Sequence, residues 1–471
     1  MASNHPLEEI LHPRSIAVVG ASDTGRGGGF VSPLIEQGFK GEIYPVNPKY
    51  EKVMGMKAYP RVKDIPGPVD FVISSIPSTG VLQMIDDCAL KGVKGIHMFT
   101  ARFSETGRQE GADLEKEVLK RIEETGIRLI GPNCMGVYYP AQGIAFNDSM
   151  PQEPGRVGVA SQSGQAVMEI VMTAGQRGIR FSKAISYGNA LDFNECDYLD
   201  YFTQDEETEI ILLYIEGVRD GKRFPQALQR AAKVKPVIVV KGGRGEAGAR
   251  AIASHTASMA GSRELWQAVV DQAGAVSAKD LEEMVDLTVA FNFLPRISRN
   301  HVGVAGGGGG SSVLAADLCE EAGLDVTPLS ADMRVEMKER GSDIWDWISN
   351  PADFSIAMGD RSKATMVIEV MALHENYDFI IVFVHGPWRS SPKPFDLEEH
   401  LKIFKLQFKD QKPFVVVFDD RPRGGGKAAA EHDDIMNQIK DKIIADQIPS
   451  FPTLGRAARS VSQMIQYYQK N

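Results

Sequence analysis

Three segments of the chain share one pattern: a short β-branched apolar run, a turn of small residues and a helix-like stretch. They read SIAVVGAS from residue 15, RVGVASQSG from residue 156 and VGVAGGGGGSS from residue 302. Further strand-like runs alternate with helix-like stretches such as 79–92 and 109–125. Because strands that alternate with helices form parallel sheets, the sequence predicts an α/β protein made of doubly wound domains with parallel sheets.

Two breaks divide this pattern. The segment NDSMPQEPG, residues 147–155, is rich in proline and polar residues, and LPRISRNH, residues 294–301, interrupts the rhythm again. We therefore expect three domains, 1–146, 147–298 and 299–471. The length of 471 residues fits about three domains of ~150 residues each.

Composition narrows the class of protein. Hydrophobic residues make up 43% and charged residues 24%, which is typical of a globular protein. The net charge of −10 argues against a general binder of nucleic acid or of anionic membranes, although a local basic site for phosphate remains compatible with it. With no signal peptide and no run of ~20 apolar residues, we expect a cytoplasmic protein that does not enter the membrane. The cysteines are widely spaced, form no CxxC pair and predict no metal site; they are Cys88, Cys134, Cys196 and Cys319.

The first small-residue turn contains Gly20, Ala21 and Ser22. Small residues let the backbone approach a phosphate, and the start of the following helix supplies free N–H groups. The dinucleotide motif GxGxxG is not matched, however, and Asn47 and Lys49 follow the next strand where an acidic ribose ligand would stand. Lys49 suits a phosphate better than a ribose diol. The alternative interpretation is a plain tight turn between strand and helix.

The second and third turns carry serines and glycines. Ser161 and Ser163 can cap a helix, and Gly164 opens its backbone to a ligand, although capping alone would explain the serines. The five successive glycines at 306–310 have a large entropic cost. This cost favours a bound anion or another close backbone contact at the third turn.

One histidine, His255, stands among small residues in the stretch ASHTASMAG, residues 253–261. Imidazole is a competent nucleophile for covalent catalysis. A phosphohistidine would need helix dipoles to hold the anion and a carboxylate to orient the other ring nitrogen. Glu216 ends the strand-like run IILLYIEG, at the edge where α/β sheets place their ligands. The alternatives are a surface histidine and a solvated strand end.

Several longer segments together carry a resemblance to a known family. They include HPRSIAVVGAS, IYPVNPKY, IGPNCMGV, SYGNALDFNECDYLDYF and KPVIVVKGGRGEAGARAIASHTASMAG. The chain resembles the α subunit of NDP-forming acyl-CoA synthetases of the ADP-forming acetyl-CoA synthetase type, which are relatives of succinyl-CoA synthetase. The resemblance implies a Rossmann-like CoA-binding domain followed by two flavodoxin-like ligase domains. It also implies the interconversion of acyl-CoA, NDP and phosphate with a carboxylic acid, CoA and NTP.

The resemblance assigns roles to single residues. It makes His255 the residue that is phosphorylated through an acyl phosphate, and Glu216 its stabilising partner. It implies that phosphate binds at Ser161, Gln162, Ser163, Gly164, Gly309, Gly310, Ser311 and Ser312. It implies that coenzyme A binds at Gly20, Ala21, Ser22, Lys49, Pro77 and Asn133.

A partner is implied as well. Nothing after residue 300 has the pattern of an ATP-grasp fold, so we expect a separate ATP-grasp β subunit that binds ATP or ADP with Mg²⁺, in an α2β2 assembly. Alone, the chain is expected not to complete a turnover. The family usually has Ser-His-Thr-Gly around the histidine, whereas Ala257 stands here in place of the glycine, which predicts a stiffer segment.

Two other functions remain open at this stage. An NAD(P)-dependent oxidoreductase would need the missing dinucleotide motif and acidic residue. A non-catalytic CoA-binding or sensing protein would bind CoA and never become phosphorylated. The identity of the small carboxylic acid is not encoded in a pattern that can be read from the sequence.

Overall fold

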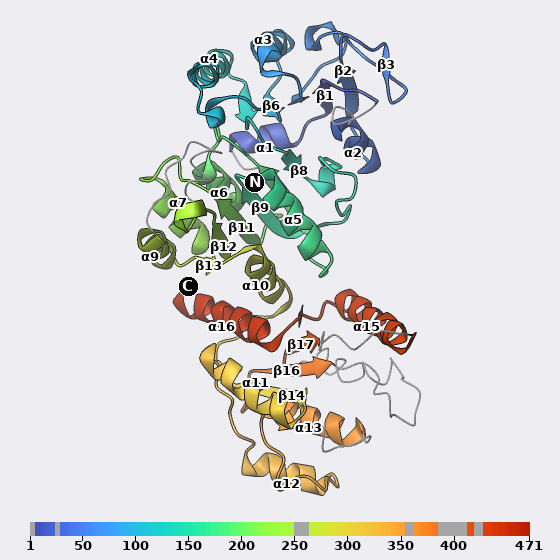
Figure 1. The fold of residues 1–471 in the computed structure, drawn as a ribbon, viewed down its shortest axis with the longest axis vertical. Coiled ribbons are helices and arrows are strands. Elements are labelled where there is room, and N and C mark those ends of the chain that lie inside the picture. The colour runs from blue at the N-terminus through green and yellow to red at the C-terminus, as the bar shows by residue number, and fades with distance from the viewer. Residues whose placement is uncertain (1–4, 24–28, 249–262, 354–360, 385–411, 419–426) are drawn as a thin grey trace. The chain divides into compact units, whose positions relative to one another are not determined.

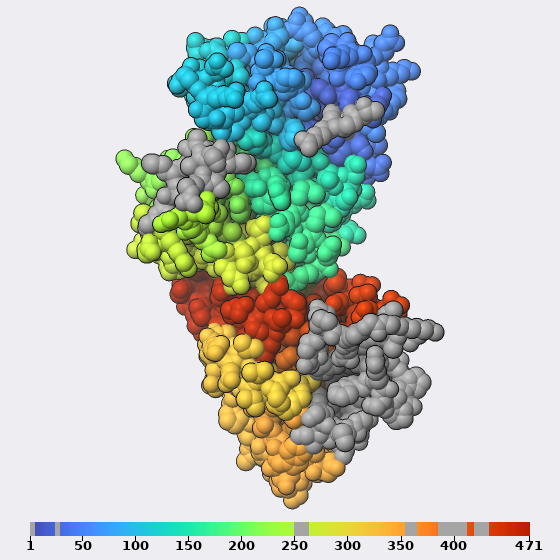
Figure 2. All heavy atoms as spheres, in the orientation of Figure 1, coloured from blue at the N-terminus to red at the C-terminus, as the bar shows by residue number. Residues whose placement is uncertain are grey.

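The structure is a computed structural model that describes residues 5–23, 29–248, 263–353, 361–384, 412–418 and 427–471. The other residues are drawn in grey in Figures 1 and 2. The chain divides into two compact units, Met1–Met284 and Val285–Asn471, and each is described by itself. Within the described ranges, no helix has both the length and the apolar character needed to cross a lipid bilayer.

The first sheet of unit 1 is parallel and has the strand order β2-β1-β5-β6-β7. Helices and a small antiparallel hairpin, β3–β4, complete this domain. The strands are β1 (Ser15–Val19), β2 (Glu42–Val46), β3 (Lys52–Val53), β4 (Met56–Lys57), β5 (Phe71–Ser74), β6 (Gly95–Met98) and β7 (Arg128–Ile130). The helices are α1 (Pro6–Leu11), α2 (Val31–Glu36), α3 (Val81–Lys91) and α4 (Gln109–Thr125).

The second sheet has the order β13-β12-β11-β9-β10-β8. Its central strands are almost wholly buried, as expected for a parallel sheet covered on both faces. The strands are β8 (Gly136–Tyr138), β9 (Pro154–Ser161), β10 (Phe181–Ser186), β11 (Ile210–Ile215), β12 (Val237–Lys241) and β13 (Val276–Ala278). The helices that follow these strands are α5 (Gly164–Gly175), α6 (Glu195–Gln204), α7 (Phe224–Ala232) and α9 (Arg263–Ala273); α10 (Leu281–Phe293) contains the boundary between the two units.

Unit 2 contains a third parallel sheet of order β15-β14-β16-β17-β18. Its apolar core includes Met333, Met371, Tyr377 and Ile439. The strands are β14 (Val302–Gly307), β15 (Ala352–Asp353), β16 (Phe379–Val384), β17 (Phe414–Phe418) and β18 (Ser450–Phe451). The helices are α11 (Gly309–Glu321), α12 (Ala331–Glu339), α13 (Arg361–Leu373), α15 (Lys427–Ala445) and α16 (Leu454–Lys470).

All three sheets place their strands in the same order, apart from β8. In each one, the first parallel strand of the chain lies between the second and the third, which is the flavodoxin-like arrangement. Ligands of such sheets bind at the carboxyl ends of the strands, where the strand order reverses. The predicted α/β class with parallel sheets is therefore confirmed, and each small-residue turn follows the first parallel strand of its sheet (Figure 1).

One strand departs from the parallel expectation. β8 pairs antiparallel with β10, through Val137 and Ile185, at the edge of the second sheet. Among the described residues, no α-helix lies between β8 and β9 in the chain. Because parallel strands need such a crossover connection, β8 runs opposite to β9 and β10. A strand this short carries no periodicity that the sequence could have revealed.

Candidate functional site

The turn between β9 and α5 is shaped by its two serines. Ser161 is fully buried at the end of β9. Its Oγ donates to the carbonyl oxygen of Ser163 at 2.8 Å and accepts the N–H of Ser163 at 3.1 Å. The Oγ of Ser163 accepts the N–H of Ala166 at 3.2 Å and so caps the helix. Both hydroxyls therefore hold the turn, and the first N–H groups of α5 remain the natural donors for an anion.

Gly164, the first residue of α5, is in close contact with the segment before β8. A Cβ at this position would lie 2.3 Å from Cγ of Met135 and 3.1 Å from its Cβ. No side chain fits there without displacing Met135. The glycine is thus required by packing, as well as being compatible with the approach of a ligand.

Gln162 connects this turn to Glu216. Its side-chain oxygen Oε1 accepts the main-chain N–H of Glu216, and it accepts the N–H of Gly217 at 2.8 Å. The N–H of Gln162 in turn donates to the carbonyl oxygen of Tyr214 at 3.1 Å. Because Oε1 is committed to the main chain, Nε2 is the atom of this side chain that could donate to a phosphate.

Glu216 directly follows β11 and is buried, with 8% of its surface exposed. Ser161 pairs with Tyr214 across the parallel strands β9 and β11, so the turn at Ser161–Gly164 and Glu216 share one carboxyl edge. This edge is where the strand order of the second sheet reverses. Burial, with a smaller contribution from Glu216, raises the pKa of Tyr214 to about 12, which keeps the phenol beside this carboxylate neutral.

His255 and Ala257 lie outside the described residues, so the pairing of His255 with Glu216 stays a prediction. Gly242 and Gly243, which begin the segment toward His255, are described. Gly242 directly follows β12, and a Cβ on it would lie 2.8 Å from Oη of Tyr214 and 3.3 Å from Cγ of Glu216. The root of the histidine segment is therefore in close contact with Glu216.

In the first sheet, the predicted CoA-binding residues follow the carboxyl ends of β1, β2, β5 and β7. Gly20 has a φ of +92°, and a Cβ there would lie 2.9 Å from Oγ of Ser75. Ala21 is buried and Ser22 is half-buried at the same turn. Pro77 is exposed and precedes a short 3-10 helix, Ser78–Gly80.

Asn47 explains why no acidic residue stands after β2. Its Nδ2 donates to the carbonyl oxygen of Ala21 at 2.8 Å, and its Oδ1 accepts the N–H of Lys49 at 3.0 Å. The asparagine thus ties the first turn to the loop that carries Lys49. Lys49 itself is exposed, as a lysine that meets a phosphate at the surface would be.

Asn133 lies where the first domain leads into the second. It has a φ of +57°, and its Nδ2 donates to Oδ1 of Asn189 at 3.3 Å. Nδ2 of Asn189 donates to Oε2 of Glu105 at 2.8 Å and to Oε2 of Glu115 at 3.2 Å. Asn133 thus belongs to a polar network that also includes Glu115 of helix α4.

The third turn lies in unit 2. Gly308 precedes α11 without a side-chain cap, and the N–H of Ser312 donates to the carbonyl oxygen of Gly308 at 2.8 Å. Gly309 and Ser311 complete the turn, and a Cβ on Gly310 would meet no described atom within 4 Å. The buried Oγ of Ser312 has no hydrogen-bond partner among the described residues. No side chain caps this helix start, so its first N–H groups are open to an anion.

Three residues of the candidate site were not predicted from the sequence: Lys241, Tyr214 and Asn189. Lys241 carried a signal, since it is a charged residue that ends the apolar run PVIVVK. Tyr214 reads as one more strand residue, and Asn189 as a turn residue. Their positions depend on strand pairing and on contacts between loops, which a single sequence does not encode.

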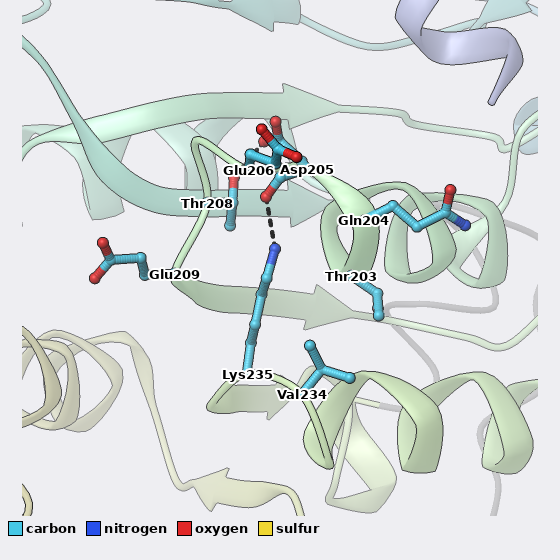
Figure 3. A pocket seen from close by; sticks show the side chains of 8 residues that line it. All are labelled: Thr203, Gln204, Asp205, Glu206, Thr208, Glu209, Val234 and Lys235. Atoms are coloured by element: carbon cyan, nitrogen blue, oxygen red, sulfur yellow. Dashed lines mark hydrogen bonds between the residues drawn. The ribbon is translucent and has the colours of Figure 1, made fainter. Parts of the chain in front are cut away.

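A cavity of about 390 Å³ lies at the opposite, amino edge of the second sheet (Figure 3). Lys235 spans it, with Nζ 2.6 Å from the carbonyl oxygen of Asp205. Because ligands of parallel α/β sheets bind at the carboxyl edge, this cavity is not the candidate site. It is lined by Thr203, Gln204, Asp205, Glu206, Thr208, Glu209, Val234 and Lys235.

Comparison with known proteins agrees with the observed fold. Two family models match, a CoA binding domain over residues 14–140 and a succinyl-CoA ligase like flavodoxin domain over residues 154–291. The parallel sheets and the two family models define the class: a protein with a CoA-binding domain followed by a flavodoxin-like domain of the succinyl-CoA ligase type.

The alignments extend beyond these two domains. The α subunit of ADP-forming acetate–CoA ligase I from Pyrococcus furiosus is 32% identical, over 98% of this chain and 97% of its own length. The α subunit of ligase II from the same organism is 34% identical, over 88% and 90%. An ADP-forming acetate–CoA ligase from Methanocaldococcus jannaschii is 40% identical over 67% of this chain, but the match spans only 44% of that protein.

A solved structure is similar over the whole chain. It is the dinucleotide forming acetyl-coenzyme A synthetase 1 of Ca. Korarchaeum cryptofilum in complex with phosphate and ADP, with a TM-score of 0.82 and 30% identity over 100% of this chain and 97% of that one. The chain belongs to the family of ADP-forming acetate–CoA ligases. The resemblance seen in the sequence is thereby confirmed, and the ligase interpretation is favoured over the oxidoreductase.

Proposed function

We propose that the chain is the α subunit of an ADP-forming acyl-CoA synthetase. The complete enzyme interconverts acyl-CoA, ADP and phosphate with a carboxylic acid, CoA and ATP. The observation that carries this proposal is the placement of Glu216 beside the N-terminus of α5, at the point where the second sheet reverses its strand order. Family membership over the length of the two P. furiosus α subunits supports it.

The first domain holds CoA in this proposal. The backbone at Gly20–Ser22 faces its phosphates, with Lys49 as the cation, and Pro77 and Asn133 line the path toward the second domain. Phosphate binds at the first N–H groups of α5 and attacks the thioester carbonyl; the C–S bond breaks, and CoA leaves with the electron pair of that bond.

The resulting acyl phosphate passes its phosphoryl group to a ring nitrogen of His255. The P–O bond to the acyl oxygen breaks, and the carboxylate is released. The carboxylate of Glu216 accepts a hydrogen bond from the N–H on the other side of the ring, which orients the imidazole and stabilises its positive charge. In the third domain, phosphate is proposed to bind at the start of α11, to the N–H groups of Gly309, Gly310 and Ser311 and to the hydroxyl of Ser312, whose own N–H is bonded to Gly308.

A separate ATP-grasp β subunit completes the enzyme in an α2β2 assembly. It would bind ADP, whose terminal phosphate oxygen takes the phosphoryl group from His255 as the N–P bond breaks and ATP forms; Mg²⁺ bound there would neutralise phosphate charge. The names of the P. furiosus relatives as subunits, together with the longer M. jannaschii relative, support this division of labour. We place the enzyme in the cytoplasm.

The test is phosphorylation of the chain. The protein is incubated with the β subunit, Mg²⁺ and ATP labelled at the γ-phosphate, and acid-labile, base-stable label is measured. We expect label in the unmodified chain, none in His255→Ala and much less in Glu216→Gln, with CoA binding retained in both variants. Unchanged label in His255→Ala would overturn the proposal, and CoA binding without any label in the unmodified chain would favour a CoA-sensing protein.

A further inference from the structure

Lys241, the last residue of β12, is buried at the candidate site, and the proposed function gives it no role. Only 8% of its surface is exposed. Its Nζ donates to the carbonyl oxygen of Glu216 at 2.6 Å and to that of Gly242 at 2.6 Å. One ammonium group therefore joins the main chain of the candidate carboxylate to the first residue of the segment that leads to His255.

The position is costly for a lysine, which is why a reason for it is needed. Burial lowers the pKa of Lys241, and the negative charge of Glu216 opposes this decrease. A buried ammonium is tolerated only when hydrogen-bond acceptors or an opposite charge compensate the loss of water. Here two carbonyl oxygens and a nearby carboxylate do so, whereas an apolar residue would leave both carbonyls without this donor.

Glu216 is thus held from two sides. Gln162 accepts its main-chain N–H on the side of β9, and Lys241 donates to its main-chain oxygen on the side of β12. β11 lies between these two strands. Neither contact uses the carboxylate of Glu216, so both fix where the strand end presents this side chain without competing for it.

We propose that Lys241 is a positioning residue for phosphoryl transfer, which fixes Glu216 against the root of the histidine segment at Gly242. This inference rests on the proposed function and adds a residue to its machinery. Lys241 does not touch the phosphoryl group; it acts through Glu216 and Gly242. Its loss is expected to slow phosphorylation of His255 far more than it weakens CoA binding, which takes place in the first domain.

The segment just before β12 offers a matched control. Lys235 lies two residues before β12, at the other edge of the sheet, and is half-buried. Its Nζ donates to the carbonyl oxygens of Phe202 at 2.7 Å and Asp205 at 2.6 Å, and burial lowers its pKa too. Lys235 thus makes the same kind of double contact as Lys241, at the amino edge of the sheet and away from the predicted site.

The experiment compares Lys241→Met, Lys241→Arg and Lys235→Met as full-length chains with the β subunit. It measures the rate of His255 labelling from ATP, CoA affinity and the urea midpoint of unfolding. We expect Lys241→Met to slow labelling by roughly 10- to 100-fold with unchanged CoA affinity. Lys241→Arg, which keeps the cation and its donors, should recover part of the rate. Lys235→Met should lower the urea midpoint and label at the normal rate.

The outcomes separate this inference from the proposed function. Equal labelling rates in Lys241→Met and Lys235→Met would overturn the role of Lys241 and leave the proposed function standing. Absence of label in the unmodified chain would overturn the proposed function itself. If Lys241→Met does not fold, Lys241→Gln takes its place, because its amide can donate to one of the two carbonyls; a normal labelling rate in that variant also counts against the inference.

Discussion

Gln162 and Glu216 are joined by a side-chain to main-chain hydrogen bond that crosses from the β9–α5 turn to the end of β11. The same side-chain oxygen accepts the N–H of Gly217 at 2.8 Å, and both contacts are buried. The residue in the middle of the Ser-Gln-Ser-Gly turn therefore determines where the neighbouring strand presents its glutamate. The turn that is predicted to bind phosphate therefore also holds Glu216 in place.

Replacing Gln162 with methionine keeps the length of the side chain and removes the acceptor. Two buried N–H groups then lose their partner, so we expect the free energy of unfolding to fall by about 1–3 kcal/mol. Phosphorylation of His255 should slow as well, because Glu216 loses one of its supports. Urea unfolding and the labelling rate are the measurements. An unfolding free energy and a labelling rate in Gln162→Met equal to those of the unmodified chain would show that the acceptor is not what matters.

Gly164→Ala should destabilise the second domain through one identifiable contact. The new Cβ would lie 2.3 Å from Cγ of Met135, and overpacking of this kind costs about 1–3 kcal/mol. The double variant Gly164→Ala, Met135→Ala removes the obstructing atom and should recover part of the loss. A double-mutant cycle in urea measures this coupling. Strictly additive effects would show that the alanine is accommodated elsewhere.

The sequence predicted the elements around the site well, because the apolar runs of buried parallel strands are continuous and their turns are rich in small residues. The helix expected at 109–125 has those bounds in the structure, and Glu216 was correctly placed at a carboxyl edge. The two-residue strands β15 and β18 were missed because two residues carry no periodicity.

The hydrogen bonds that hold Glu216 in place could not be predicted from the sequence either. The contacts of Gln162 and Lys241 join strands that are far apart in the chain, and they depend on the register in which β9, β11 and β12 pair. The role of serine and glycine at a turn can be predicted, because helix capping depends on residues that are close together in the sequence. A lysine that donates to two carbonyl oxygens leaves no local pattern beyond its place at the end of an apolar run.

Gly310→Ala separates a binding role from a structural one at the third turn. A Cβ there meets no described atom within 4 Å, and Gly310 lies in the first turn of α11. Since alanine favours the helix over glycine by about 0.5–1 kcal/mol, we expect a slightly higher free energy of unfolding. Turnover with the β subunit should nevertheless fall, because the methyl group would face the proposed phosphate. Gly309→Ala is the comparison for turnover. Its Cβ would lie 3.0 Å from Oδ2 of Asp353, so a loss of turnover in that variant can come from crowding within the protein. Full turnover in Gly310→Ala would remove this residue from the phosphate site.

His97 should make the stability of the first domain depend on pH. The ring is buried under Gly136, and its Nε2 lies 3.1 Å from the carbonyl oxygen of Cys134. Burial lowers the pKa of His97 from 6.5 to about 4. Between these two values the unfolded chain binds a proton that the folded chain does not. The contribution of neutral His97 to the free energy of unfolding is therefore complete above pH 6.5 and is lost as the pH falls toward 4. The shift corresponds to about 3 kcal/mol.

The carboxylates of the protein also titrate as the pH falls, so the contribution of His97 is isolated by difference. His97→Gln places an amide N–H near the position of Nε2, so it can keep a donor for the carbonyl of Cys134, and it removes the titrating ring. We expect the variant to be less stable than the unmodified chain at pH 7, because a smaller side chain leaves space beside Phe30, whose ring centroid lies 5.4 Å from that of His97. This difference in unfolding free energy should shrink steadily from pH 6.5 to pH 4, since only the unmodified chain then has to exclude a proton from a buried ring. A difference that stays constant over this range would mean that His97 is protonated in the folded protein near its ordinary pKa.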